Sequence, residues 1–492
     1  MGYKRFKLNT IKILIFIVLL INTLFLGKGA ISIPDEVRYI RSYEGLEAFI
    51  EHGDHNFFFG EIVINAGNPT YQIFSLIPSG IQYILEKTAG INHLTRHSLL
   101  IPQFFNCLVL FGIIFFLFLI TKEKLTTIFA MLFSLLVLLS TFSTIYLRHL
   151  LPYDLSIFVF IIMIYQLINL KSTNFRKACF GLGILSSLSF TIYTGYFFFS
   201  IIIYIILILE LKKGFFKTTF YYTLGWLPLT TLFEILGRLA NTSYIHSIFN
   251  HSSTITQGDF NEGFLFPFKY IYVSEGFFGV LIIFFSFLYV FKALTTKGYI
   301  ANTSVLEKTL LTSILIFIIY CLQCYFLNKL VWYGRIVHFF VLIMAISSFI
   351  FIMNLKNTLK HVLIFPLFLF AGINFLNKYN SFKKIDYPRD ILEINKVLII
   401  KDESNQFSFT IPGVKPYFPF QNKDFVYRKV ENCGLLWPSK ESKIETNNKE
   451  TKHTLLKEYE HFLNYEPYLF EGYNRNQRKA LLESPIFIKI LD

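Results

Sequence analysis

The sequence predicts an α-helical polytopic membrane protein with about 11 transmembrane helices and a small extracytoplasmic α/β domain at its C-terminus. Hydrophobic residues make up 54% of the 492 residues and charged residues only 16%, a composition too apolar for an ordinary soluble protein. Apolar runs of bilayer length recur as far as residue 377. Lys and Arg concentrate in alternate connections between these runs, as they do in multi-span membrane proteins.

The first apolar run, residues 11–26, follows Lys4, Arg5, Lys7 and Lys12. No convincing small-residue cleavage site follows it, so we expect an uncleaved first helix with a cytoplasmic N-terminus. Ten further runs predict spans of bilayer length. They lie at about 99–120, 125–145, 155–170, 178–192, 196–210, 217–234, 273–291, 309–327, 336–354 and 361–377.

The alternation of these spans fixes an orientation. The segments assigned to the cytoplasm hold about 17 Lys and Arg in about 53 residues, and the opposite loops hold about 10 in about 132. A membrane domain, residues 1–377, therefore carries two large outer loops, 28–98 and 235–272. A cell membrane, inner or plasma, is the expected location, and the tail 378–492 is expected on the outer side.

The formal charge of +14 is largely a topology signal. The tail holds 19 basic and 16 acidic residues, so most of the surplus belongs to the membrane domain. Because no basic stripe interleaves with aromatic residues, nucleic acid is excluded as a partner. Within the tail, residues 396–418 alternate short β-branched runs with turns and residues 450–470 have helical spacing, which predicts the α/β domain.

The first outer loop opens with ISIPDEVRYIRSYEGLEAFIEHGD. Ser32 as a cap and Pro34 in the first turn predict a helix lying along the membrane surface. Asp35 and Glu36 then have two interpretations. Acids at a helix start are favoured by the helix dipole, whereas two carboxylates just outside a span also suit a general base.

Several segments share their order and spacing with one enzyme family. IPDEVRYI is followed by HGDHNFF, NPTYQIFSLIPSGIQYIL and LTRHSLLIPQFFNCLVL, then by IYLRHLLPYDLSIFVF and WYGRIVHFF. Up to about residue 355 this order resembles C-type glycosyltransferases (GT-C fold, family 39-like), which include the protein mannosyltransferases and the lipid A aminoarabinose transferases. The residues at matching places in the first outer loop and at the head of the second span are Asp35, Glu36, Arg38, Tyr39, Gly53, Asp54, Pro69, Tyr71 and Arg96, and those in the later segments are Arg148, Asp154 and Arg335.

The resemblance implies transfer of a sugar from a polyprenyl-phosphate donor to a lipid, glycan or protein hydroxyl at the outer face, with inversion. Asp35, paired with Glu36, is the family's catalytic position and would take the acceptor's proton. Arg148, Arg335 and Lys329 would hold the donor phosphate, although a cation at a span end can also simply reach the headgroups. Arg38, Tyr39, Arg96 and Asp154 would support the site, and Asp154 has a plain ion pair as its alternative.

The sequence departs from the aminoarabinose transferases at their metal site. Their Glu-Lys-Pro-Pro segment is replaced by NAGNPTYQ, which has no acid. His246 and His251 in the second outer loop are therefore only weak candidates for metal ligands, and no cofactor is assigned with certainty. Glu51, His52, Asp54 and His55 fit a solvated turn better than a metal site.

Two other classes of membrane protein remain open as alternatives to a glycosyltransferase. A transporter or lipid flippase would carry Gly/Pro-broken spans and charges at the bilayer midplane, whereas most charges here lie at span ends. A surface-polysaccharide polymerase or ligase would place essential cations in a large late outer loop, but loop 235–272 contains only Arg238 and Lys269 as bases.

Overall fold

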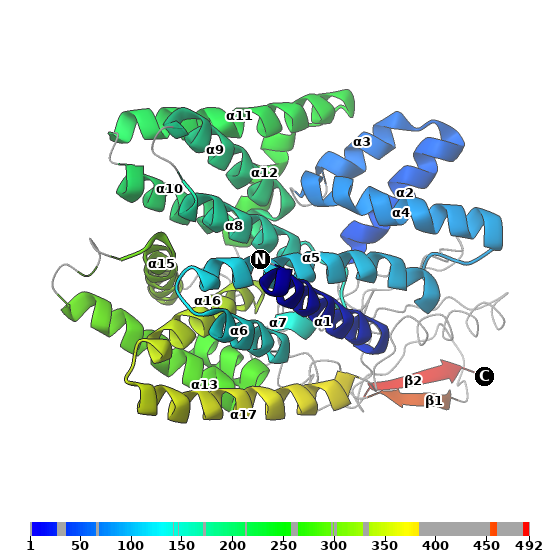
Figure 1. Ribbon diagram of the computed structural model, residues 1–492. Coiled ribbons are helices and arrows are strands. Elements are labelled where there is room, and N and C mark those ends of the chain that lie inside the picture. The colour runs from blue at the N-terminus through cyan, green and yellow to red at the C-terminus, as the bar shows by residue number, and fades with distance from the viewer. Residues whose placement is uncertain are drawn as a thin grey trace.

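The computed structural model is dominated by helices (Figure 1). It describes residues 2–26, 36–64, 68–140, 142–145, 147–170, 174–211, 214–256, 264–296, 299, 303–327, 334–382, 453–459 and 486–491. Up to the second outer loop the elements are α1 (Gly2–Leu26), α2 (Val37–His52), α3 (His55–Ile64), α4 (Pro69–Ala89), α5 (Arg96–Lys122), α6 (Thr127–Leu139), α7 (Phe142–Ile145), α8 (Tyr153–Ile168), α9 (Phe175–Ile192), η3 (Thr194–Tyr196), α10 (Phe198–Leu211), α11 (Phe215–Leu239) and α12 (Tyr244–Thr256). They are followed by α13 (Phe266–Thr295), α15 (Val305–Leu327), α16 (Gly334–Met353), α17 (Asn357–Phe382), β1 (His453–Tyr459) and β2 (Ile486–Leu491).

Six helical segments in the described part of the chain are long and apolar enough to cross a membrane. They are Arg96–Lys122, Thr194–Leu211, Pro267–Thr295, Val305–Gln323, Arg335–Met353 and Asn357–Asn380. Three apolar helices of 10–17 residues, Lys12–Leu26, Thr127–Leu139 and Tyr153–Ile168, are shorter. A helical membrane protein is therefore confirmed. A helix covers most of each of the 11 expected ranges, but a count of 11 spans stays a prediction.

The helices pack closely where small residues face one another. A Cβ added to Gly183 of α9 would lie 2.2 Å from the carbonyl oxygen of Tyr222 in α11, and one added to Gly225 would lie 2.3 Å from the carbonyl oxygen of Phe180. Between α13 and α16, the Ser286 hydroxyl is 2.8 Å from that of Ser347 and 3.1 Å from that of Ser348. Small and hydroxyl residues bring helix backbones together in this way in membrane proteins.

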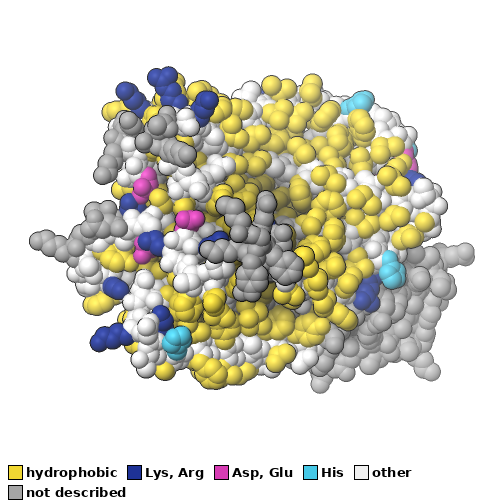
Figure 2. Space-filling model, viewed as in Figure 1, with side chains coloured by type: hydrophobic (Ala, Val, Ile, Leu, Met, Phe, Trp, Pro, Cys, Tyr) yellow, Lys and Arg dark blue, Asp and Glu magenta, His cyan; other side chains and the backbone are white. Residues whose placement is uncertain are grey.

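The outer surface of the bundle is apolar. Figure 2 shows hydrophobic side chains over much of the face in view, while most of the charged side chains in view gather toward the left edge, where helices end. Residues such as Ile17, Phe220 and Phe365 are exposed. Large apolar side chains facing outward on long helices are expected where lipid is the solvent.

The first outer loop is almost entirely helical. α2 is the expected surface helix, but its described start is Val37, and Ser32, Pro34 and Asp35 lie outside the described residues. Gly53 ends α2 in a left-handed conformation with φ 64°, which glycine adopts without strain. Asp54 then caps α3, because the amide of Phe57 donates to Asp54 Oδ1 at 2.9 Å. This part of the acidic and histidine cluster is thus the solvated turn that we expected.

Beyond the end of α17, the tail is described only at two strands. β1 and β2 pair antiparallel, with His453 opposite Leu491 and Tyr459 opposite Ile486. β1 lies within residues 450–470, where the spacing predicts a helix, so this local prediction is wrong. Pairing with a strand almost thirty residues further on decides the conformation, and periodicity within one segment does not contain that information. The α/β domain as a whole stays a prediction, and α17 runs through its expected start at residue 378.

Candidate functional site

A buried connection, the 147–154 segment, joins α7 to the first turn of α8 and carries two of the predicted site residues. Two of its backbone carbonyls accept hydrogen bonds from side chains of α5. Gln103 Nε2 of α5 donates to the carbonyl oxygen of Arg148 at 3.1 Å, and Asn106 Nδ2 donates to that of His149 at 2.8 Å. A loop can be buried only where such partners exist. The segment is therefore held in one conformation.

Glu36 binds the same segment from the start of α2. Its side chain is fully buried, and Glu36 Oε1 accepts a hydrogen bond from the amide of Leu150 at 2.8 Å. His149 Nδ1 lies 3.4 Å from Glu36 Oε2. Glu36 stands at the N-terminus of α2, where the helix dipole favours an acid, but its side chain makes no capping hydrogen bond to α2. Instead its carboxylate joins α2 to a segment more than a hundred residues away.

Arg148 is one of the largest fully buried side chains in the described structure. Its Nε donates to the carbonyl oxygen of Leu26, the last residue of α1, at 2.7 Å. The last carbonyls of a helix lack partners within the helix and carry its negative end, so a guanidinium is well suited to this position. Full burial is incompatible with the headgroup anchor that we weighed for this residue.

Arg335 lies at the head of α16, in partial contact with solvent. Its Nη1 donates to the hydroxyl of Tyr153 at 3.0 Å. The guanidinium carbon also lies 5.6 Å from the ring centroid of Tyr153 and 5.8 Å from that of Tyr193, within the range of cation–π attraction. The hydroxyl of Tyr196 donates to the carbonyl oxygen of Arg335. Tyrosines from three elements thus orient this arginine.

Asp154 and His338 form a buried pair one helical turn further in. His338 Nε2 lies within hydrogen-bonding distance, 3.1 Å, of Asp154 Oδ1, and the imidazole stacks on Phe142 with ring centroids 4.3 Å apart. His338 follows Arg335 by three residues, so both lie on one face of α16. That spacing is visible in WYGRIVHFF, where the resemblance points only to the arginine. This contact is a buried hydrogen bond and becomes an ion pair only when His338 is protonated, so it does not decide between the two roles that we weighed for Asp154.

The structure thus gathers Glu36, Arg148, Asp154 and Arg335 around the 147–154 segment, together with His149 and His338, which sequence reasoning missed. Lys329 and Asp35 lie outside the described residues.

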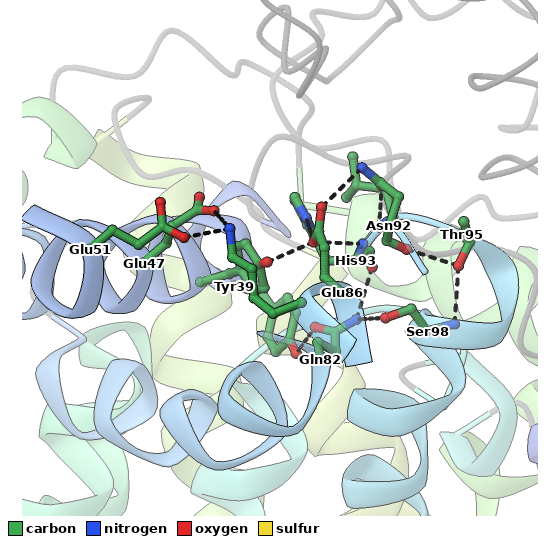
Figure 3. Close-up of polar contacts among 12 residues, drawn as sticks. Tyr39, Glu47, Glu51, Gln82, Glu86, Asn92, His93, Thr95 and Ser98 are labelled. Carbon is green, nitrogen blue, oxygen red and sulfur yellow. Dashed lines mark hydrogen bonds and ion pairs between the residues drawn. The ribbon is translucent and has the colours of Figure 1, made fainter. Parts of the chain in front are cut away.

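Tyr39 of the first outer loop belongs to a polar network between α2, α4 and the start of α5 (Figure 3). Buried Tyr39 donates to Gln82 Oε1 at 2.5 Å. Gln82 Nε2 in turn donates to the carbonyl oxygen of His93 at 2.8 Å and to Ser98 Oγ at 2.9 Å. Arg38 is buried next to Tyr39 on α2, and Arg96 is the first residue of α5. This network holds α2, and with it Glu36, against the membrane helices.

Glu86 is the centre of the outer part of this network. The hydroxyl of Tyr43 donates to Glu86 Oε2 at 2.6 Å, and His93 Nδ1 lies 2.8 Å from the same oxygen. Burial alone would raise the pKa of Glu86, but these hydrogen bonds outweigh it and hold the pKa below its usual value. Beside it, Lys87 forms ion pairs with Glu51 and with Glu47. The carboxylate of Glu51 is thus bound to a lysine.

The weak metal candidates do not form a donor set within the described structure. His246 is exposed on α12, and the side chain of His251 lies outside the described residues. In the part of the chain that was searched, no group of three or more His, Cys, Asp and Glu side chains is arranged to hold a metal ion.

Glu44, on α2, makes the stability of the loop sensitive to pH. Burial first, and then the negative charge of Glu61, raise its pKa to about 7. A raised carboxyl pKa means that the folded state binds the proton more tightly than the unfolded state, so this contribution is present at low pH and is lost as pH rises through about 7. We expect Glu44→Gln to raise the melting temperature at pH 8 and to change it little at pH 5.

A matched variant checks the cause. Glu61→Gln removes the neighbouring negative charge, so the pH at which wild-type stability falls should move lower. The measurement is the melting temperature in detergent between pH 5 and pH 8. If the melting temperature of Glu44→Gln differs between pH 5 and pH 8 by as much as that of the wild type, another group causes the pH dependence.

Comparison with known proteins adds no family to these observations. No protein-family model matches the chain, and no curated protein sequence matches it significantly. The residues around the 147–154 segment therefore carry the functional inference by their chemistry and by their order in the sequence.

Proposed function

We propose that this protein is a membrane glycosyltransferase of the C type, which moves a sugar from a polyprenyl-phosphate donor to an acceptor hydroxyl at the outer face. The observation that carries the proposal is the convergence of Glu36, the 147–154 segment and Arg335. Residues from three distant parts of the chain, each matched to the family by motif, meet at one group of helix ends. A carboxylate beside cations is the combination that this reaction needs.

Asp35 is the proposed general base. Both oxygens of Glu36 already face the 147–154 segment, at the amide of Leu150 and the ring of His149. Glu36 thus serves as a positioning residue, and we assign the chemistry to Asp35, the position that the resemblance implies. Asp35 would take the proton of the acceptor hydroxyl as its oxygen attacks the anomeric carbon and the bond to the lipid phosphate breaks. A single displacement of this kind inverts the anomeric configuration.

Arg335 is the proposed phosphate ligand. Its partial exposure lets a ligand approach the guanidinium, whose plane the tyrosines fix, and a guanidinium binds phosphate oxygens through paired donors. Lys329 remains a second candidate. For Arg148, full burial and the bond to Leu26 favour a structural role over donor contact. The leaving lipid phosphate would then be stabilised by Arg335 in the transition state.

The same proposal includes the membrane topology. We propose that the protein has about 11 spans, a cytoplasmic N-terminus and an extracytoplasmic tail, and that it lies in a cell membrane. The acceptor is a lipid, glycan or protein hydroxyl.

Arg335→Ala should raise the apparent KM for the polyprenyl-phosphate donor by about tenfold or more, because a charged hydrogen bond to phosphate is lost. The measurement is the initial rate of polyprenyl phosphate release in vesicles across donor concentrations. Tyr153→Phe should have a smaller effect, since it keeps the ring face and removes only the hydroxyl.

Arg176→Ala is the control, because Arg176 is also an arginine at a helix start beside a tyrosine ring, 5.6 Å from that of Tyr221. It should leave the KM unchanged. An Arg335→Ala variant with wild-type KM would show that Arg335 is only an interfacial anchor.

A further inference from the structure

α4 exposes its apolar face and buries its polar face, the reverse of a surface helix in a soluble protein. Between Pro69 and Glu86 its only exposed residues are four isoleucines, Ile73, Ile77, Ile81 and Ile84, with 40%, 55%, 42% and 60% of their surface accessible. Their spacing of four, four and three residues places them on one face. The fully buried side of α4 instead carries Gln72, Ser75, Ser79 and Gln82. A helix in water shows the opposite arrangement.

Hydrogen bonds fix this orientation. On the inner face, Gln82 bonds to Tyr39 of α2 and to Ser98 of α5, and Gln72 accepts from Ser42 of α2. Near the start of α4, the hydroxyls of Thr70 and Thr191 are 2.7 Å apart, which joins it to the end of α9. Rotation of α4 to bury the isoleucines would break these contacts. The isoleucine stripe is thus a stable part of the outer surface.

The surroundings of the stripe identify what covers it. α4 packs on α5, one of the candidate membrane spans, whose Phe104 and Leu108 are also exposed. Residues 69–85 contain no Asp, Glu, Lys or Arg, and charge begins at Glu86 and Lys87. From Ile73 to Ile84 the stripe is about 16 Å long, about half of the hydrocarbon thickness of a bilayer.

We propose that α4 is embedded in the lipid bilayer through the stripe Ile73, Ile77, Ile81 and Ile84, so that acyl chains cover this face. The first outer loop is then a membrane-embedded subdomain, and its polar interior is shielded from lipid by α4. The proposal does not depend on the proposed enzymatic function.

The test places the photoreactive residue p-benzoylphenylalanine at Ile77, at Ile81 or at Thr88 in the full chain. Thr88 is the control because it is exposed on the same helix beyond the stripe, where Lys87 is ion-paired with acids of α2. The chain is irradiated in vesicles of phosphatidylcholine and phosphatidylglycerol, and its adducts are identified by mass spectrometry. We expect phospholipid adducts at Ile77 and Ile81 with a yield several-fold above that at Thr88.

Three results would overturn the proposal: attachment of Ile77 to a second copy of the chain, equal lipid yields at Ile77 and Thr88, or no lipid adduct at Ile77 and Ile81. A pair of charge variants gives an independent check. Ile77→Lys should reduce the folded fraction recovered in vesicles, whereas Thr88→Lys should not. Equal recovery of the two variants would also contradict an embedded stripe.

Discussion

Asp35→Asn should lower the rate of sugar transfer by about 10²- to 10⁴-fold, the usual contribution of a general base. The substitution keeps the size of the side chain and removes its basicity, so kcat should fall while the KM for the donor changes little. Membrane insertion and yield should match wild type. The measurement is release of polyprenyl phosphate from the donor that the wild-type chain cleaves.

Asp54→Asn is the matched control in the same loop. Asp54 is exposed and accepts from the amide of Phe57 at the start of α3, and asparagine caps a helix as well as aspartate does. Its activity should remain close to wild type. Near-normal transfer by Asp35→Asn, or an equal loss in both variants, would remove Asp35 from its proposed role.

Arg148→Ala should lower the free energy of unfolding by about 3 kcal/mol or more. The change leaves a cavity where a large buried side chain stood, and it removes the partner of the Leu26 carbonyl. The end of α1 would then lose its attachment to the 147–154 segment. The measurement is SDS-induced unfolding from mixed micelles, followed by tryptophan fluorescence.

Arg238→Ala provides the comparison for stability. Arg238 has 72% of its side chain exposed and pairs with Glu234 one turn away on α11, and such surface pairs contribute little. Its unfolding free energy should change by less than about 0.5 kcal/mol. An Arg148→Ala variant as stable as Arg238→Ala would mean that the buried guanidinium does not hold α1 in place.

The membrane helices could be predicted because each depends on a local property, a long apolar run. α4 could not be recognised as a membrane segment in the same way. Gln72, Ser75, Pro78 and Gln82 lower its average hydropathy, and only its packing shows that the polar residues point inward. β1 was mispredicted for a related reason, since its strand conformation depends on pairing with β2.

Motif order pointed to Arg148, Asp154 and Arg335, which lie in or beside the 147–154 segment, while their roles stay predictions. The partners of these residues were not predictable. The contact of Glu36 with Leu150 joins positions 114 residues apart, and nothing in either local segment specifies it. The dipole of α2 explained an acid at Glu36 well enough by itself, so the contact with the 147–154 segment became visible only in the fold.

The most direct test of the central claim follows the donor itself. The purified chain in vesicles is incubated with polyprenyl-phosphate sugars and candidate acceptors, and the lipid product and the anomeric configuration are determined. We expect the chain to release polyprenyl phosphate and to form an inverted glycoside. Movement of the intact donor between leaflets without cleavage of its sugar–phosphate bond would contradict the account and would identify a lipid flippase instead.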